Sequence, residues 1–500
     1  MSANDLIRSE SELCKIADAL SEDARRSNTL VVSRHLNVAG EYVYFKDGKN
    51  LHSDFKVSSL NKELPEGIYT STTEGDISAD NAHLIQVARD LEPQRFRFRH
   101  KGVPLPTSHD VFFENMPSNI DCFDDELREF TKDHPNTYTQ RQFYVVQQVI
   151  VNSEGGVAIQ SVPFFEIRYG HGFEPIPTNR SITAVCNTDA DVAKMQSLIK
   201  FLPDPTPDKR IKNAKSFSQA FHQLTAVSGL KYGSLEEAGI ELAGLYDVVV
   251  LSGVPAHEVF GHQFEEPVRF IEFGESGTFK LGQSIENKDI IIRDDPHMTL
   301  SGLRVRGFTH FDSYGRPRQT REHIKNGRVV GFLGSEYADL ENLAGFMNIR
   351  NDVFVGNASQ YIDSVFPQPR MSCTVLTGKA EEVDLEGKIL LVSHEGHTDS
   401  SDKTYNVSAK ECYVVKNGEP KRVVPLKVTG GINQALANIV LINDLSYNTG
   451  FCSKGDPINY PSGRAQVPVS QFANSQIWQG QQVYSLPISD RHLRILQNEK

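Results

Sequence analysis

Hydrophobic residues recur every three or four positions near the N-terminus, a spacing typical of an amphipathic helix. Within residues 5–26 the positions that follow it are Leu6, Leu13, Ile16, Ala17 and Leu20. The same criterion predicts four further helices, over residues 79–92, 189–202, 216–227 and 433–444. This spacing therefore predicts five helices, which are separated along the chain.

Alternation of apolar and polar residues dominates most of the remaining sequence, and this period indicates half-buried β-strands. Residues 31–57 predict strands that are broken at Asp47-Gly48, and residues 141–172 predict a hairpin that turns at Gly155-Gly156. From residue 277 onward short β segments prevail. The predicted ones lie at 288–295, 327–334, 370–378, 387–397 and 411–431.

A Pro-rich stretch, PDPTPDK at residues 203–209, predicts a boundary or hinge. It separates the N-terminal part, which has helices and long strands, from the part dominated by short β segments. We place the domain change near residue 230. The predicted fold class is α+β. An N-terminal domain, residues 1–230, combines helices with an antiparallel sheet, and a C-terminal domain, residues 231–500, is mostly antiparallel β and partly barrel-like.

Composition and charge narrow the possible functions. The 500 residues are 39% hydrophobic and 23% charged, an ordinary globular profile, and the formal net charge is −12. An acidic chain without a basic stripe lacks the cationic surface that nucleic acids need, so we expect no nucleic-acid partner. We predict neither a signal peptide nor a membrane span, and six scattered cysteines favour a reduced, cytoplasmic protein.

The stretch VPAHEVFGHQFEE, residues 254–266, carries the strongest chemical signal. It places Glu258 beside His257, and it places His262 five positions after His257. Two histidines and a glutamate on one helix are typical of zinc hydrolases, where the histidines hold the metal and the glutamate acts as general base. The same residues also occur together by chance, in which case they are surface side chains.

The five-residue spacing is unusual, since positions five apart on an α-helix point about 140° away from each other. His257 and His262 can bind the same ion only if the helix widens by one residue, as in a π-bulge, or if the helix ends before His262. Pro255 favours the start of a helix just before His257. Gly261 lowers the energetic cost of a backbone distortion just before His262. The sequence therefore predicts a locally distorted helix at this motif.

The sequence YDVVVLSGVPAHEVFGHQFEE, residues 246–266, resembles the HExxxH motif of the TldD/PmbA family of metalloproteases. Weaker similarity continues through residues 312–333, 367–379 and 411–445, and the segment GFCSKGD, residues 450–456, stands where active members carry a cysteine. The resemblance covers roughly residues 230–470 well and the first half of the chain poorly.

This resemblance implies a third metal ligand, Cys452, beside His257 and His262. It also implies one zinc ion per chain, with Glu258 as general base toward a metal-activated water. A thiolate and two imidazoles form a tetrahedral zinc set with one open position. Taken alone, Cys452 is equally explained as a small buried apolar residue. Family members form dimers, so we expect a homodimer or a heterodimer with a paralogue.

The sequence departs from the family pattern at two places. Ser453 replaces the usual glycine after the cysteine, and residues 393–406, SHEGHTDSSDKTYN, replace a glycine-rich stretch. We expect His394 and His397 to be loop residues that line the site or contact substrate, with metal ligation as the less favoured alternative. Nearer the motif, Glu265 and Glu266 are alternative carboxylate ligands, but we expect them to form a solvated face.

The expected function is zinc-dependent hydrolysis of peptide bonds in unfolded or precursor peptides. Two alternatives stay open at this point. One is a non-catalytic partner subunit of a TldD/TldE-like complex. The other is a metal-dependent enzyme that performs different chemistry on a small modified peptide or metabolite.

Overall fold

A computed structural model describes most of the chain. The described residues are 7–27, 32–64, 67–74, 105–172, 178–241, 244–265, 279–334, 356–359, 367–399, 403–455 and 464–486. Among these residues, none of the helices is both long enough and apolar enough to traverse a membrane.

The first sheet is built from long strands in the N-terminal half, and the described part contains β1 (Val32–Lys46), β2 (Lys49–Leu64), β3 (Gly67–Glu74), β4 (His109–Phe113), β5 (Thr137–Asn152), β6 (Val157–His171) and β7 (Thr178–Val185). Their order is β3-β2-β1-β5-β6-β4, with β7 also paired to β6. The turn between β1 and β2 uses Asp47 and Gly48, both at positive φ, as the predicted break requires.

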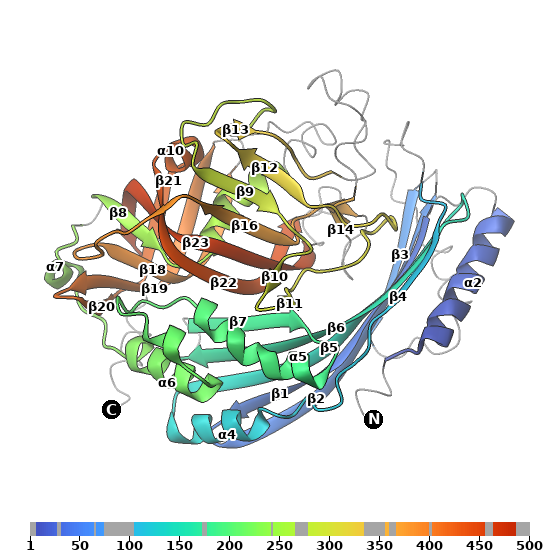
Figure 1. The fold of residues 1–500 in the computed structure, drawn as a ribbon, viewed down its shortest axis with the longest axis horizontal. Coiled ribbons are helices and arrows are strands. Elements are labelled where there is room, and N and C mark those ends of the chain that lie inside the picture. The colour runs from blue at the N-terminus through green and yellow to red at the C-terminus, as the bar shows by residue number, and fades with distance from the viewer. Residues whose placement is uncertain are drawn as a thin grey trace.

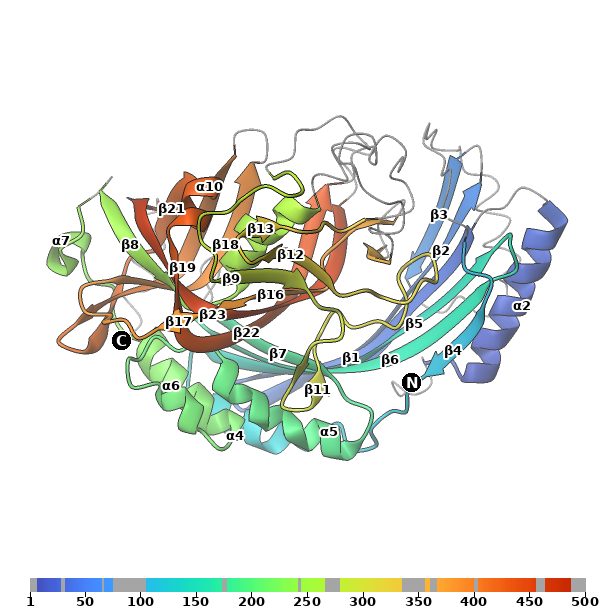
Figure 2. The same ribbon diagram turned by 45° about the horizontal axis from the view of Figure 1, so that its top comes forward.

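Helices cover the outer face of this sheet (Figures 1 and 2). They are α2 (Glu10–Ser27), α4 (Asp124–Asp133), α5 (Asp189–Lys194) and α6 (Phe217–Ser228), with short 3-10 turns at Met195–Phe201 and Arg210–Asn213. Leu13 and Ile16 of α2 share a buried cluster with Val149 and Ile159. The amphipathic spacing of α2 therefore serves to bury its apolar stripe against β5 and β6.

The second sheet lies against the inner face of the first (Figure 2). In the described residues it comprises β8 (Leu245–Val250), β9 (Ile290–Asp294), β12 (Arg321–Lys325), β13 (Arg328–Val329), β16 (Cys373–Gly378), β17 (Ala380–Glu381), β18 (Ile389–Asp399), β19 (Thr404–Lys416), β20 (Glu419–Val423), β21 (Leu426–Gly431), β22 (Ile439–Gly455) and β23 (Arg464–Ser485). The pairs β16–β23, β18–β8 and β17–β22 are parallel, and the other pairs are antiparallel.

Five of these described strands close into a ring, because β23 pairs with both β21 and β8 while β21, β19, β18 and β8 follow one another. Phe260, Tyr405 and Trp478 fill the core that this sheet encloses. The α+β prediction is confirmed, and the ring corresponds to its partly barrel-like feature. Smaller elements complete the described part: α7 (Leu235–Ala238), α10 (Ile432–Ala437), β10 (Thr299–Leu300), β11 (Leu303–Arg304), β14 (Ala358–Ser359) and β15 (Gln368–Pro369).

The predicted helices near the N-terminus, at 189–202 and at 216–227 are present as α2, as α5 with its 3-10 extension, and as α6. The helix predicted over 433–444 is wrong in its second half. Helix α10 ends at Ala437, and β22 begins at Ile439, where it pairs with Trp478 of β23. The helix predicted at 79–92 lies outside the described residues.

The strands of the first sheet all precede residue 230, and those of the second all follow it. Buried clusters nevertheless join the two halves. One of them combines Phe143 and Phe165 of the first sheet with Val375 and Phe472 of the second. The division of the chain into domains at residue 230 remains a prediction.

Candidate metal centre

The motif at 254–266 forms a distorted helix after strand β8. A π-helical turn spans Ala256–Phe260, and a 3-10 turn spans Gly261–Phe264. The N–H of Gly261 donates to the carbonyl of Ala256, five residues earlier, which adds one residue to the turn. The rings of His257 and His262 lie 4.9 Å apart between centroids. The predicted widening of the helix therefore brings two histidines five apart onto one side.

His257 is completely buried, and its surroundings fix which nitrogen faces the site. The Thr374 hydroxyl donates to the sulfur of Met371, so its oxygen accepts a hydrogen bond from Nδ1 of His257 at 2.7 Å. The other nitrogen, Nε2, is buried and makes no hydrogen bond with the described residues. A buried imidazole lone pair without a donor is the arrangement expected of a metal ligand.

His262 is oriented in the same way by a carboxylate. Its Nδ1 lies 2.9 Å from Oε2 of the fully buried Glu265, and its Nε2 lies 3.2 Å from the sulfur of Cys452. Burial lowers the pKa of His262, but the negative groups of Cys452, Glu258 and Glu265 outweigh it and raise the pKa well above its usual value. The expectation that Glu265 is solvated is wrong, since this side chain supports His262 from within the core; Glu266 lies outside the described residues.

Cys452 reaches the same point from β22, where it pairs with Val467 of β23. Burial alone would raise the pKa of its thiol. The positive charges of His262 and Arg370 outweigh burial and lower the pKa of Cys452 to about 6. The guanidinium of Arg370 also donates to the Cys452 carbonyl at 3.0 Å. Cys452 is thus a thiolate near neutral pH, which is the form that binds metals.

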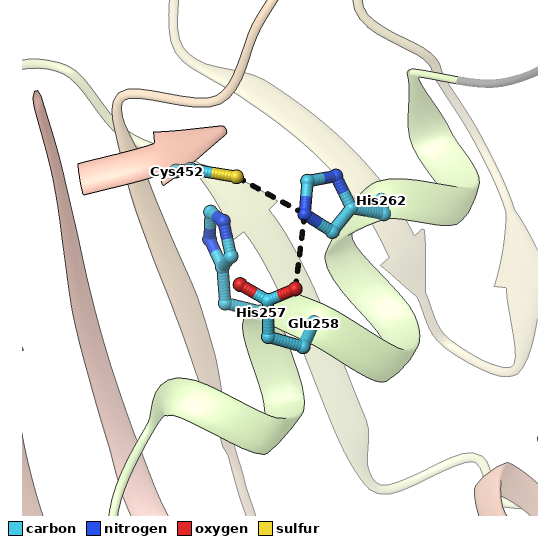
Figure 3. Close-up of side chains that lie close together, drawn as sticks. All are labelled: His257, Glu258, His262 and Cys452. Carbon is cyan, nitrogen blue, oxygen red and sulfur yellow. Dashed lines mark hydrogen bonds and ion pairs between the residues drawn. The ribbon is translucent and has the colours of Figure 1, made fainter. Parts of the chain in front are cut away.

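Glu258 faces this group from the π-helical turn, with Oε2 3.4 Å from Nε2 of His262 (Figure 3). Its side chain is 21% exposed and is the most accessible of the four. Burial raises the pKa of Glu258, but the charges of His262, His257 and Arg370 outweigh burial and lower it. An ionised, partly accessible carboxylate in this position can accept a proton from a water molecule.

One ligand atom from each of His257, Glu258, His262 and Cys452 lies within 4.8 Å of the corresponding atoms of the other three. Two imidazoles and a thiolate suit zinc, and carboxylate, imidazole and thiolate together also suit other transition metals. The buried Nε2 of His257 fits a bound cation, because it is otherwise a polar atom without a partner among the described residues. The lowered pKa of Cys452 favours the thiolate, which is the form that binds metals.

His394 and His397 are not loop residues as expected. Both lie on β18, where they pair with Ala409 and Asn406 of β19. The strand continues through them because β19 supplies an antiparallel partner for the whole segment, with a register shift between Ser393 and His394. Whether they contact substrate remains a prediction.

The sequence interpretation missed three residues that hold the site together, Thr374, Arg370 and Met371, and it gave Glu265 a different role. The three missed residues belong to the segment 367–379, whose similarity to the family carried no assigned role. Met371 binds Oε1 of Glu265 through its backbone N–H at 2.8 Å, and Arg370 lies 3.3 Å from the same oxygen. This segment therefore braces the helix that carries the histidines.

Comparison with known proteins agrees with this geometry. Residues 244–471 match the profile of the PmbA/TldA metallopeptidase C-terminal domain. A protein named metalloprotease, from Archaeoglobus fulgidus, is 27% identical over 228 residues, which are 44% of this chain and 48% of that protein. The chain thus matches about half the length of this curated relative.

Two solved structures share the fold along nearly the whole chain. TldE from Thermococcus kodakarensis is 11% identical, with a TM-score of 0.58, and the match covers 94% of this chain and 99% of that one. A proposed modulator of a DNA gyrase from Thermotoga maritima MSB8 is 15% identical, with a TM-score of 0.55, and the match covers 95% and 100%. At such identities the likeness concerns the fold.

The fold and the histidine motif together define a protein with a metallopeptidase-type C-terminal domain. Residues 244–471 thus belong to the C-terminal domain family of the PmbA/TldA metallopeptidases. The resemblance inferred from residues 246–266 and from the later segments is confirmed.

Proposed function

We propose that this protein is a metal-dependent peptidase that hydrolyses peptide bonds in unfolded or precursor peptides. His257, His262 and Cys452 are the proposed ligands of one zinc ion per chain, and Glu258 is the proposed general base. The observation that carries the proposal is the convergence of these four side chains on one point, with Nε2 of His257 buried and unbonded.

Zinc held by two imidazoles and a thiolate would act as a Lewis acid toward the peptide carbonyl and toward a water molecule. The chain's own contribution begins with Glu258, which takes one proton from water. The hydroxide oxygen bonds to the carbonyl carbon as the C–N bond breaks, and the Glu258 proton passes to the leaving nitrogen. The products are one carboxylic acid and one amine, so the atoms of water are accounted for.

The proposal also covers the substrate and the oligomeric state. A peptide is the proposed substrate, and a homodimer is the proposed assembly, with a heterodimer with a paralogue as the other possibility. TldE, the name of one structural neighbour, supports assembly of this second kind. A role on DNA gyrase is not proposed, because neither the net charge of −12 nor a sequence motif supports one.

The two alternatives are not favoured. A non-catalytic partner subunit has no need of a glutamate held ionised beside two oriented histidines. Different chemistry on a small metabolite is not favoured, because residues 244–471 match a metallopeptidase domain.

The first test is elemental analysis of the purified protein with two ligand variants, Cys452→Ala and His262→Ala. We expect about one zinc per chain in the wild type and a large loss in both variants. Cys412→Ala, at another buried cysteine, and His222→Ala, at an exposed histidine on α6, are matched controls that should keep the metal.

Cleavage of unfolded protein and of peptides tests the reaction itself. Glu258→Gln should retain zinc and lower kcat by at least about 10²-fold, the usual contribution of a general base. A wild-type protein that binds no zinc, or a Glu258→Gln variant that cleaves at the wild-type rate, contradicts the proposal.

A further inference from the structure

A small pocket is formed jointly by the two halves of the chain, and we call it the Arg318 pocket. Its walls include Leu36 of β1, Val146 and Gln148 of β5, Thr309, Arg318 and Ser359. None of the four residues of the candidate metal centre lines it. None of the steps proposed for hydrolysis uses it.

Arg318 brings an unused donor to this pocket. The residue is only 7% exposed. Its Nε donates to the Thr309 hydroxyl at 3.0 Å, and its Nη2 donates to the Ser359 hydroxyl. Nη1 is buried and makes no hydrogen bond with the described residues. A buried guanidinium N–H without an acceptor is costly, so a guest that supplies an acceptor is favoured.

The two hydroxyls that accept from Arg318 can each donate in turn. An arginine N–H only donates, so the oxygens of Thr309 and Ser359 are the acceptors in these two bonds. Neither hydroxyl donates a hydrogen bond to another described residue. Both hydroxyl hydrogens are therefore left for a guest.

Gln148 adds a fourth donor, and a chain of hydrogen bonds fixes the orientation of its amide. The backbone N–H groups of His310 and Phe311 donate to Oε1 of Gln160. Nε2 of Gln160 is then the group that donates to Oε1 of Gln148, at 2.7 Å. Nε2 of Gln148 is left as a donor, and it makes no hydrogen bond within the described part of the chain.

Two buried carboxylates, Asp294 and Asp312, face Arg318 without taking its Nη1. Each of them accepts hydrogen bonds from two backbone N–H groups instead. Their charges weaken the attraction of Arg318 for a further anion. An anion in the pocket would therefore be held mainly by hydrogen bonds, and with modest affinity.

The groups left over are all donors, and this selects the guest. A carboxylate offers acceptors only, whereas a carboxamide brings two N–H groups that need acceptors of their own. The pocket has a volume of about 60 Å³. A water needs about 10–15 Å³, so there is room for roughly four to six non-hydrogen atoms. Acetate and propionate fall within that size.

We propose that the Arg318 pocket binds the carboxylate of a short aliphatic acid. The carboxylate oxygens accept from Arg318, Gln148 and the two hydroxyls, and the aliphatic end lies against Leu36 and Val146. A free acid and an acidic side chain of a peptide present this same chemistry. The inference goes beyond the proposed peptidase function and does not depend on it.

Saturation-transfer NMR on the purified full chain tests the proposal, with propionate as the probe. We expect a dissociation constant in the millimolar range, as is usual for so small a ligand. Propionamide, which has nearly the same shape, should bind at least about 10-fold more weakly, because its N–H groups meet donors. Equal binding of the two compounds, or no binding of propionate, overturns the proposal.

Gln148→Glu tests the same contact from the side of the protein. It keeps the size and the accepting oxygen of the side chain and replaces the remaining donor with a negative oxygen. Propionate should bind at least about 10-fold more weakly. Gln479→Glu makes the same change at an exposed position of β23 and should bind like the wild type. Unchanged binding in Gln148→Glu overturns the proposal.

Arg318→Met removes the guanidinium itself and should abolish propionate binding. The variant also leaves Asp294 and Asp312 without their counter-charge, so its fold is checked by urea unfolding. Should it fail to fold, Gln148→Glu still decides. A folded Arg318→Met variant that binds propionate like the wild type overturns the proposal.

Carboxylates also bind zinc, so the measurement is repeated on His262→Ala, the variant expected to lose the metal. Propionate should bind this variant as it binds the wild type. Loss of binding would place the acid on the metal and overturn the proposal. The result is independent of whether the wild type cleaves peptides.

Competition with peptides identifies the source of the carboxylate. The probe peptide has one internal glutamate and an amidated C-terminus, and its control has glutamine at the same position. Displacement of propionate by the glutamate peptide alone supports the pocket and assigns it to peptides. Binding of propionate that neither peptide displaces supports the pocket and assigns it to free acids. Equal displacement by both peptides overturns recognition of a carboxylate.

Discussion

Two residues outside the ligand set determine how the histidines present themselves to a metal. Thr374 holds Nδ1 of His257, and Glu265 holds Nδ1 of His262, so each ring turns Nε2 toward Cys452 and Glu258. Outer partners of this kind fix the tautomer and raise the basicity of the ligating nitrogen. The metal affinity of the site is therefore expected to depend on residues that never touch the ion.

Thr374→Val tests this dependence, since valine keeps the shape of threonine and removes the hydroxyl. We expect zinc affinity to fall about 10- to 100-fold while one zinc per chain still binds at saturation. Competition with a chromogenic chelator measures the change. Thr377→Val, three residues along the same strand and only half-buried, serves as the control. Equal affinities of Thr374→Val and wild type would contradict the role given to Thr374.

At the scale of elements, the distorted helix depends on close contact with the strand segment 370–374. Gly261 lies where any side chain would meet Met371, with the missing Cβ 2.5 Å from its sulfur and 3.4 Å from a methyl carbon of Thr374. The φ of Gly261 is an ordinary helical −61°, so the glycine is required for space and not for backbone conformation.

Gly261→Ala should therefore lower the free energy of unfolding by about 1–3 kcal/mol, the usual cost of overpacking, and should weaken zinc binding as the turn shifts. The double variant Gly261→Ala/Met371→Ala should recover part of the lost stability and part of the lost zinc affinity, because it removes the obstructing sulfur. Urea unfolding measures the stability, and zinc titration measures the affinity. Gly450→Ala on β22, where a Cβ would meet nothing within 4 Å, should be nearly neutral.

The distortion of this helix could be predicted from sequence because it is local: five residues separate His257 from His262, and helix geometry does the rest. The burial of Glu265 could not, since the N–H that it accepts belongs to Met371, 106 residues later. Residues 439–444 were misassigned for the same kind of reason. The apolar run IVLIND is compatible with either a helix or a buried strand. It forms a strand because it pairs with β23.

At the scale of the whole molecule, polar contacts join the N-terminal and C-terminal halves of the chain beside their apolar packing. Arg180 of β7 and Glu411 of β19 form an ion pair at 2.8 Å in which both side chains are buried. Glu114, which follows β4, accepts hydrogen bonds from Arg304 of β11 and from His310, both at 2.8 Å. The packing of the two halves against each other therefore depends partly on charge, and so on pH.

Glu114 offers the clearest test of that dependence. Burial raises its pKa, but hydrogen bonds from His310 and Arg304 outweigh burial and lower the pKa to about 2 from an ordinary value of 4.5. A pKa lowered by folding means that the ionised form stabilises the fold above the unfolded pKa, and that this contribution is lost as pH falls from about 4.5 toward 2. With its side chain 16% exposed, solvent screening reduces the contribution to about 2 kcal/mol.

Glu114→Gln should therefore lower the free energy of unfolding by about 2 kcal/mol at pH 7, and the difference from wild type should narrow as pH falls from 5 to 3.5. Urea midpoints measured across that range give the comparison. Glu129→Gln, at an exposed glutamate of α4, should change stability by less than about 0.5 kcal/mol at either end. A difference for Glu114→Gln that stays constant with pH would show that the carboxylate's charge does not hold Glu114 to Arg304 and His310.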